Sequence, residues 1–154
     1  MVKGMDNLRQ LAAELLEIEK RFLLEEKEEY RTAIVVVVTS AGRYWEEVEF
    51  DDEDEKLDAY AAIVGRAKES NAIAIITLNT SFEKSLESSD ELRDYRWGDL
   101  SQSCSQRAIT VTISGPSVSA CSLSLPYRFE NGAVLLSEVS GFQPAVIDLL
   151  PDWP

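Results

Sequence analysis

The residues best suited to chemistry in this sequence are the carboxylates between Glu46 and Glu55, where eight of ten residues are acidic. Carboxylate oxygens are the ligands that Ca²⁺ and Mg²⁺ prefer. The spacing does not fit an EF-hand, because a loop starting at Asp51 would need glycine where Lys56 stands and a bidentate acid where Ala62 stands. We interpret the segment as a solvated strand face followed by an acidic helix start, with weak divalent-cation binding or a basic protein partner as alternatives.

A second possible chemistry is catalysis by paired carboxylates. Glu47 and Glu49 flank Val48 in an expected strand, which would place both carboxylates on one face, about 6.5 to 7 Å apart by the strand rise. Acid and base roles require two different environments, and the sequence gives no sign of a pocket that would supply them. A metal-dependent hydrolase that uses carboxylates is therefore an alternative hypothesis behind a non-catalytic function.

Other catalytic chemistries lack the residues they need. The chain contains no histidine, which excludes histidine-based acid/base catalysis, Ser-His-Asp and Cys-His nucleophiles, and histidine metal ligands. No GxxxxGK[ST], GxGxxG or GxSxG motif occurs. Ser81 and Lys84 spell an SxxK motif, but the companion motifs of penicillin-recognising enzymes are missing, so we interpret the match as chance. Cys104 and Cys121 match no disulfide framework or metal spacing and are expected to be reduced thiols, with Cys121 packed as a small hydrophobe.

The charge of the chain restricts its partners. The net charge is −13, and a surface of this sign disfavours nucleic acid and anionic membranes, which both attract Lys and Arg. No apolar run reaches the roughly 18 to 20 residues of a membrane span, and the N-terminus lacks a signal-peptide pattern. We therefore expect a cytoplasmic protein.

Residues 6–30 have the periodicity of an amphipathic helix. Apolar side chains recur at heptad spacing: Leu8, Leu11, Leu15, Ile18 and Phe22. This seam predicts a homodimer in which the helix contributes the partner-binding residues. Leu16 and Leu23 widen the stripe, so packing of the helix on its own sheet is the alternative.

The middle of the chain alternates strand and helix signals. Residues 32–39 form a β-branched apolar run, typical of a strand buried on both faces. A turn then leads to a second strand that ends near Phe50, so the pair predicts a hairpin. The acidic residues from Asp51 to Glu55 predict an N-cap and first helical turn, Asn71 a helix end, and residues 72–78 another buried strand.

Residues 79–106 are rich in Ser, Asp, Glu and Arg and lack periodicity, which predicts a long irregular loop. Long loops in compact domains often bind partners, so Tyr95 and Trp97 within it are also candidate partner-binding residues.

The last third of the chain predicts a meander of strands. Asn131 and Gly132 favour a type I′ turn, whose register would pair Phe129 with Val134 and Tyr127 with Leu136 on one face. Residues 144–150 suggest a short helix. Trp153 either docks on the core or forms an exposed partner contact.

The stretch from Tyr44 to Leu78 contains Tyr-Trp-Glu-Glu-Val-Glu-Phe, an acidic linker, a helix and the strand Ala-Ile-Ala-Ile-Ile-Thr-Leu. In this it resembles small acidic bacterial and phage proteins of unknown function. The resemblance covers about half the chain and supports the strand order, and it implies no chemistry.

Taken together, these patterns predict a single α+β domain over residues 1–154. Its mixed or antiparallel sheet would have five to six strands, with one helix packed on a face and an N-terminal amphipathic helix. The leading hypothesis for function is a non-catalytic acidic protein-interaction module of bacterial or phage origin that forms a homodimer. Its alternatives are the metal-dependent hydrolase and a nucleic-acid-mimicking inhibitor of a basic protein. We assign no catalytic residue and expect no cofactor and no metal ion.

Overall fold

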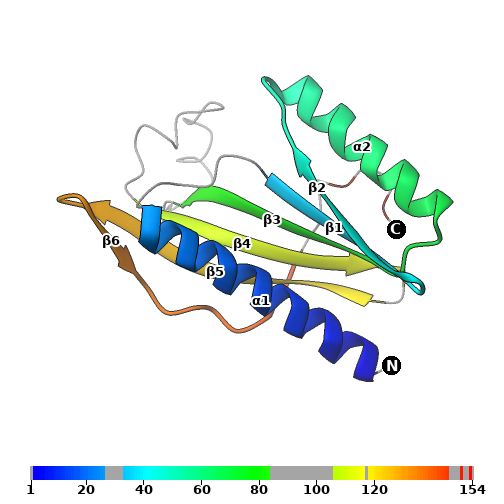
Figure 1. Ribbon diagram of the computed structural model, residues 1–154, viewed down its shortest axis with the longest axis horizontal. Coiled ribbons are helices and arrows are strands. Elements are labelled where there is room, and N and C mark those ends of the chain that lie inside the picture. Colours follow the sequence, from blue (N-terminus) through cyan, green and yellow to red (C-terminus); the bar gives the residue numbers. More distant parts are fainter. Residues whose placement is uncertain are drawn as a thin grey trace, which may run out of the picture.

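The chain folds around a long twisted sheet that carries one helix against each face (Figure 1). The computed structural model describes residues 2–26, 33–83, 106–116, 118–145, 150 and 153. The elements in these ranges are α1 (Val2–Glu26), β1 (Ala33–Thr39), β2 (Gly42–Val48), α2 (Glu53–Glu69), β3 (Ala74–Glu83), β4 (Gln106–Gly115), β5 (Val118–Glu130), β6 (Ala133–Leu136) and β7 (Gln143–Pro144).

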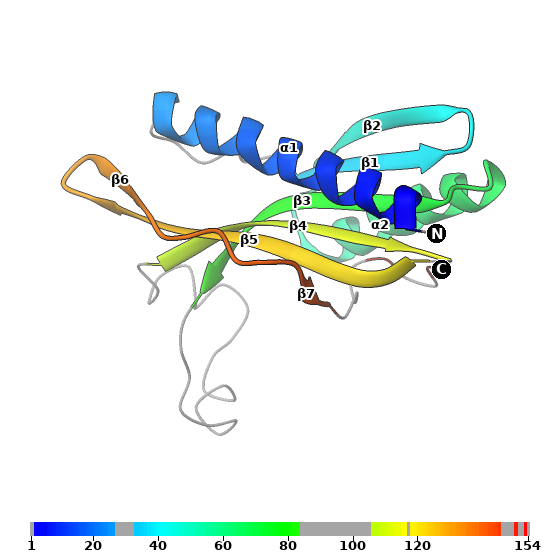
Figure 2. The same cartoon turned by 90° about the horizontal axis from the view of Figure 1, so that it is seen from below.

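The strands of the described part form one sheet in the order β2-β1-β3-β4-β5-β6, with β7 pairing β5, and every pairing is antiparallel. The predicted α+β class is therefore confirmed, in its antiparallel form. The described segments contain seven strands, more than the five to six predicted, because β6 and β7 are too short to give a clear alternation pattern. The β1–β2 hairpin lies at one edge of the sheet, and β6 and β7 lie at the opposite edge (Figure 2).

Strand β1 is buried on both faces, as its apolar run predicts. Successive side chains of a strand point to opposite faces. Val36 accordingly joins the core beneath α1, whereas Val35 and Val37, each 0% exposed, join the core beneath α2. The sheet thus separates two hydrophobic cores, and β1 contributes to both.

Helix α1 packs on the sheet through a face different from the predicted seam. Its core-facing residues are Leu8, Ala12, Leu16, Glu19 and Leu23. Of the heptad seam, only Leu8 belongs to this buried set; Leu11 and Leu15 are half-buried beside it, and Ile18 is 61% exposed. Packing on the chain's own sheet, the alternative to self-pairing, is therefore the observed arrangement for Leu8, Leu16 and Leu23.

Helix α2 covers the other face and begins where the acidic signal predicts. Asp52 is its N-cap, and Asn71, just past its end, has a positive φ of 54°. Among its buried residues, Tyr60 has its pKa raised from 10.0 to about 12, because burial removes hydration from the phenolate. A pKa raised on folding stabilises the fold fully below pH 10.0, and this contribution is lost as the pH rises toward about 12.

The β5–β6 hairpin has the register that the Asn-Gly pair predicts. Asn131 and Gly132 both have positive φ, and Phe129 pairs with Val134 while Tyr127 pairs with Leu136. All four of these strand residues belong to, or pack against, the core beneath α1. The turn thus sets the register of this hairpin, and the register gathers its apolar side chains on the buried face.

Near the C-terminus, Trp153 is docked in the core beneath α2. Its indole Nε1 donates a hydrogen bond to the buried hydroxyl of Ser114 in β4, at 3.1 Å. Pro144, which the sequence suggested as the start of a short helix, lies instead in β7, because its segment pairs with β5. Residues 146–149 of that expected helix lie outside the described ranges. Cys121 is buried as predicted, and Cys104 lies outside the described ranges.

Gly115 and Gly65 give a matched test of the packing. A Cβ atom at Gly115 would collide with the backbone carbonyl oxygen of Ile73, whereas a Cβ at Gly65 in α2 would meet nothing within 4 Å. We expect Gly115→Ala to lower the free energy of unfolding by about 2 kcal/mol, and Gly65→Ala to raise it by about 0.5–1 kcal/mol. Urea denaturation measures both. Equal effects of the two substitutions would contradict the close approach of β4 to the chain before β3.

The indole hydrogen bond of Trp153 gives a second test. Trp153→Phe keeps a large ring but removes the donor, so we expect a loss of about 1 kcal/mol; Trp153→Ala should cost about 3–5 kcal/mol because it empties the site. Ser114→Ala combined with Trp153→Phe should cost less than the sum of the single changes, since both remove the same bond. Strict additivity in thermal or urea unfolding would show that the bond contributes nothing.

Candidate functional site

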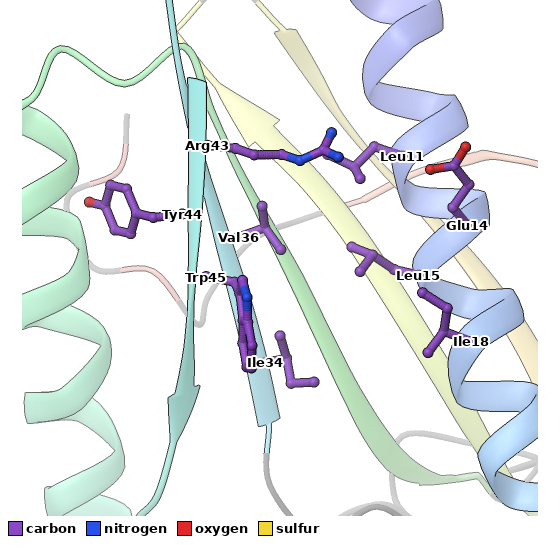
Figure 3. Close-up of a pocket in the computed structure, with 9 residues that line it drawn as sticks. All are labelled: Leu11, Glu14, Leu15, Ile18, Ile34, Val36, Arg43, Tyr44 and Trp45. Atoms are coloured by element: carbon purple, nitrogen blue, oxygen red, sulfur yellow. The ribbon is translucent and has the colours of Figure 1, made fainter. Parts of the chain in front are cut away.

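A groove of about 330 Å³ lies on the surface between α1 and the β1–β2 hairpin (Figure 3). Its lining is mostly apolar and comes from three elements: Leu11, Glu14, Leu15 and Ile18 of α1, Ile34 and Val36 of β1, and Arg43, Tyr44 and Trp45 of β2. Apolar side chains from the first helix and the first hairpin thus meet at one site.

The pairing of β1 with β2 sets the floor and one wall of the groove. Val36 pairs with Trp45 and Val38 pairs with Arg43, so the side chains of these β2 residues share the face on which α1 packs. Figure 3 shows Arg43 extending toward α1 and Trp45 lying over β1 beside Ile34, whereas Tyr44 points away toward α2. Trp45 is 63% exposed.

Helix α1 forms the opposite wall because it crosses only part of the sheet. Its main contacts are with β4, β5 and β3, and it leaves part of the β1–β2 hairpin uncovered on this face, where Ile34 and Val36 line the groove. Leu11, Leu15 and Ile18 follow the spacing of one helical stripe and line the groove beside the face that is buried in the core. Glu14 and Arg43 add one charge of each sign to the lining.

The predicted partner-binding residues are divided by the structure. Leu11, Leu15 and Ile18 line the groove. Leu8 is buried in the core, and Phe22 is half-buried and interacts with another residue of the chain. The other two candidates, Tyr95 and Trp97, lie outside the described residues.

Sequence reasoning did not identify the hairpin side of the groove. The signal that could have revealed it is the alternation of Arg43, Trp45 and Glu47 in β2, which puts a large aromatic on the same face as two charges. A strand buried on that face would carry apolar residues at these positions, so the pattern indicates an exposed face with an aromatic contact.

The acidic stretch takes part in local structure. The Asp52 carboxylate accepts a hydrogen bond from the Glu55 N–H, and the Glu55 carboxylate accepts one from the Asp51 N–H, both at 2.8 Å. The first bond is the N-cap bond of α2, and in the second Glu55 reaches back to the residue before the cap, one position beyond the N–H used in a capping box. Arg66 of α2 places Nη2 2.8 Å from both carboxylate oxygens of Glu46, which links the helix to β2.

The other candidate chemistries do not come together as a site. Within the described ranges, no group of three or more Cys, Asp or Glu residues is arranged to hold a metal ion. Glu47 lies in β2 but Glu49 follows the end of that strand, so the two acids do not share a regular strand face. Of the SxxK residues, Ser81 lies in β3 and Lys84 lies outside the described part.

A comparison of the chain with protein-family models, with curated proteins and with solved structures gives no match. Among the described segments, no helix combines the length and apolar character needed to cross a membrane.

The N-cap of α2 can be tested by paired substitutions. Asp52→Ala removes the acceptor for the Glu55 N–H and should lower the free energy of unfolding by about 1 kcal/mol, whereas Asp52→Asn keeps an acceptor and should change it little. Asp51→Ala, one residue earlier, is the control and should stay within about 0.5 kcal/mol. Urea denaturation gives all three values. An equal loss for Asp52→Ala and Asp52→Asn would instead indicate that the charge, and not the cap, stabilises the helix.

Proposed function

We propose that this chain is a non-catalytic protein-interaction module that binds an apolar segment of a basic partner protein in the groove between α1 and the β1–β2 hairpin. The observation that carries the proposal is that Ile18 and Trp45, both more than half exposed, stand on opposite walls of a groove with an apolar floor. Contiguous exposed apolar surface of this kind marks sites of association. Tryptophan is among the residues that contribute most to binding at protein interfaces.

The charge of the chain supports a basic partner. The net charge is −13, and exposed acids of α1, such as Glu14 and Glu17, lie along the helix that walls the groove. Attraction between unlike surfaces speeds encounter and selects the partner, whereas the apolar contacts supply most of the affinity. A segment with apolar residues on one side and Lys or Arg beside them matches both properties of the site.

The sequence supports the non-catalytic part of the proposal. It contains no histidine and none of the nucleotide or hydrolase motifs considered above. The lining of the groove contributes two charged side chains, Glu14 and Arg43, of opposite sign. This chemistry suits recognition of a segment by burial of its apolar residues.

Selection from a random peptide library tests the proposal with a defined probe. Peptides that bind the full chain should share apolar or aromatic residues on one side and carry Lys or Arg. Ile18→Glu should raise the Kd of a selected peptide at least about tenfold, because it places a charge among the apolar contacts. The fluorescence of exposed Trp45 should also change as the peptide binds.

Leu135→Glu provides the matched control, since Leu135 is an exposed leucine on β6, away from the groove. This substitution should leave peptide affinity unchanged. Selected peptides that lack a shared pattern, or that bind the Ile18→Glu variant as tightly as the original chain, would contradict the proposal.

A further inference from the structure

We propose that β2 is a self-association edge, at which two copies of this chain pair their β2 strands antiparallel about a twofold axis at Trp45. The pairing would join the two sheets into one continuous sheet. The inference uses the edge of β2, whose Arg43 and Trp45 also line the groove, and its test is separate from that of peptide binding.

The direction of the β2 backbone groups follows from one hydrogen bond. The Ile73 N–H donates to the Val38 carbonyl oxygen at 2.8 Å, so this carbonyl faces β3. The backbone N–H and C=O groups of successive strand residues face opposite sides of the strand, so those of Val37 face β2. Val37 pairs with Tyr44, and the N–H and C=O groups of Tyr44 therefore face β1. The N–H and C=O groups of Arg43 and Trp45 therefore face away from the sheet.

The edge of the sheet formed by β2 is longer and more regular than the opposite edge, which β6 and β7 form. In the described part of the chain, all seven residues of β2 pair with β1 in one continuous register, and β2 pairs with no other strand. The opposite edge is divided between β6, of four residues, and β7, of two residues that include Pro144. Short and proline-containing edges resist pairing with another chain, whereas a long regular edge presents a row of unpaired N–H and C=O groups to it.

The side chains of β2 are complementary to those of a second, antiparallel β2. A twofold axis at Trp45 places Arg43 opposite Glu47 of the second copy, and Glu47 opposite Arg43 of the second copy. On the other face it places Tyr44 opposite Glu46 of the second copy. Opposite charges at directly paired positions stabilise a sheet. Glu47 already makes an interaction within its own chain, so the contact between copies would be added to it.

Neighbouring registers lack this complementarity. An axis at Arg43, Glu46 or Glu47 would place each of these charges opposite itself, and like charges at paired positions are destabilising. An axis at Tyr44 gives no Arg-Glu pair. The register centred on Trp45 also brings together the exposed indole rings of the two copies, and aromatic pairs across strands are favourable.

Sedimentation equilibrium of the full chain tests the proposal. We expect a dimer of about twice the 17.2 kDa chain mass at micromolar concentration. Arg43→Glu and Glu47→Arg should each weaken the dimer about tenfold, because each converts two attractive pairs into two repulsive ones. The double variant, with the charges exchanged, should recover most of the original affinity.

Net charge provides an internal control. Arg43→Glu changes the charge of −13 to −15, whereas Glu47→Arg changes it to −11. Simple repulsion between acidic chains would therefore shift the dimer in opposite directions in the two variants. The proposed pairing requires both to weaken it. Opposite shifts, a single-chain mass across the micromolar range, or a dimer broken by Ile18→Glu but not by Arg43→Glu would each overturn it.

Cross-linking gives a second, independent readout. Paired residues of antiparallel strands have Cα atoms about 5.5 Å apart, within the range that a disulfide bridges. Trp45→Cys in a Cys104→Ser background should form a disulfide-linked dimer on mild oxidation, with Cys121 protected by burial. Leu135→Cys, exposed on β6, should cross-link far less. A folded Trp45→Cys variant that does not cross-link faster than this control would overturn the proposal.

Discussion

The two-sided burial of β1 is the constraint on which the rest of the structure depends. Val35 and Val37 face α2 while Val36 faces α1, so neither core is complete without this strand. Pairing with β3 on one side and β2 on the other satisfies the backbone of β1. Because β1 cannot shift by one residue without exchanging its faces, it also fixes which side chains of β2 point toward α1.

The groove follows from the widths of the elements. A helix with its side chains is about 10 Å across, whereas neighbouring strands lie about 4.8 Å apart, so one helix covers about two strands. Helix α1 packs mainly on β4, with fewer contacts to β5 and β3, and so leaves part of the β1–β2 hairpin uncovered. The residual apolar surface of β1 becomes the floor of the groove, and Trp45 stands at its outer side.

Local signals in the sequence predicted the parts of the fold that depend on local chemistry. The Asn131-Gly132 turn gave the register of its hairpin, and the acidic start of α2 was confirmed with Asp52 as its cap. The buried face of α1 was not resolved in this way, because leucines at adjacent positions such as 15 and 16 make two helix faces equally apolar. Strand β7 was missed since two residues carry no periodicity.

The candidate site was only half predictable for a related reason. The helix wall, with Leu15 and Ile18, stands out as an apolar stripe in the sequence. The alternation of Arg43, Trp45 and Glu47 indicates an exposed strand face with one aromatic residue, but the position at which α1 crosses the sheet beside it is a tertiary property that this local pattern does not encode. The acidic stretch attracted a metal hypothesis by its composition, yet Glu46 and Glu55 contribute to a salt bridge and a cap.

The order of α1 along the chain has a consequence for folding during synthesis. Helix α1 comes first in the sequence, but it packs on β4 and β5, which are made much later. Synthesis proceeds at about 5–20 residues per second, so the leucines of α1 stay uncovered for on the order of ten seconds before β4 and β5 have been made. The β1–β2 hairpin, by contrast, needs only adjacent residues to form. The nascent chain therefore presents an amphipathic helix to chaperones long before its hydrophobic cores can close.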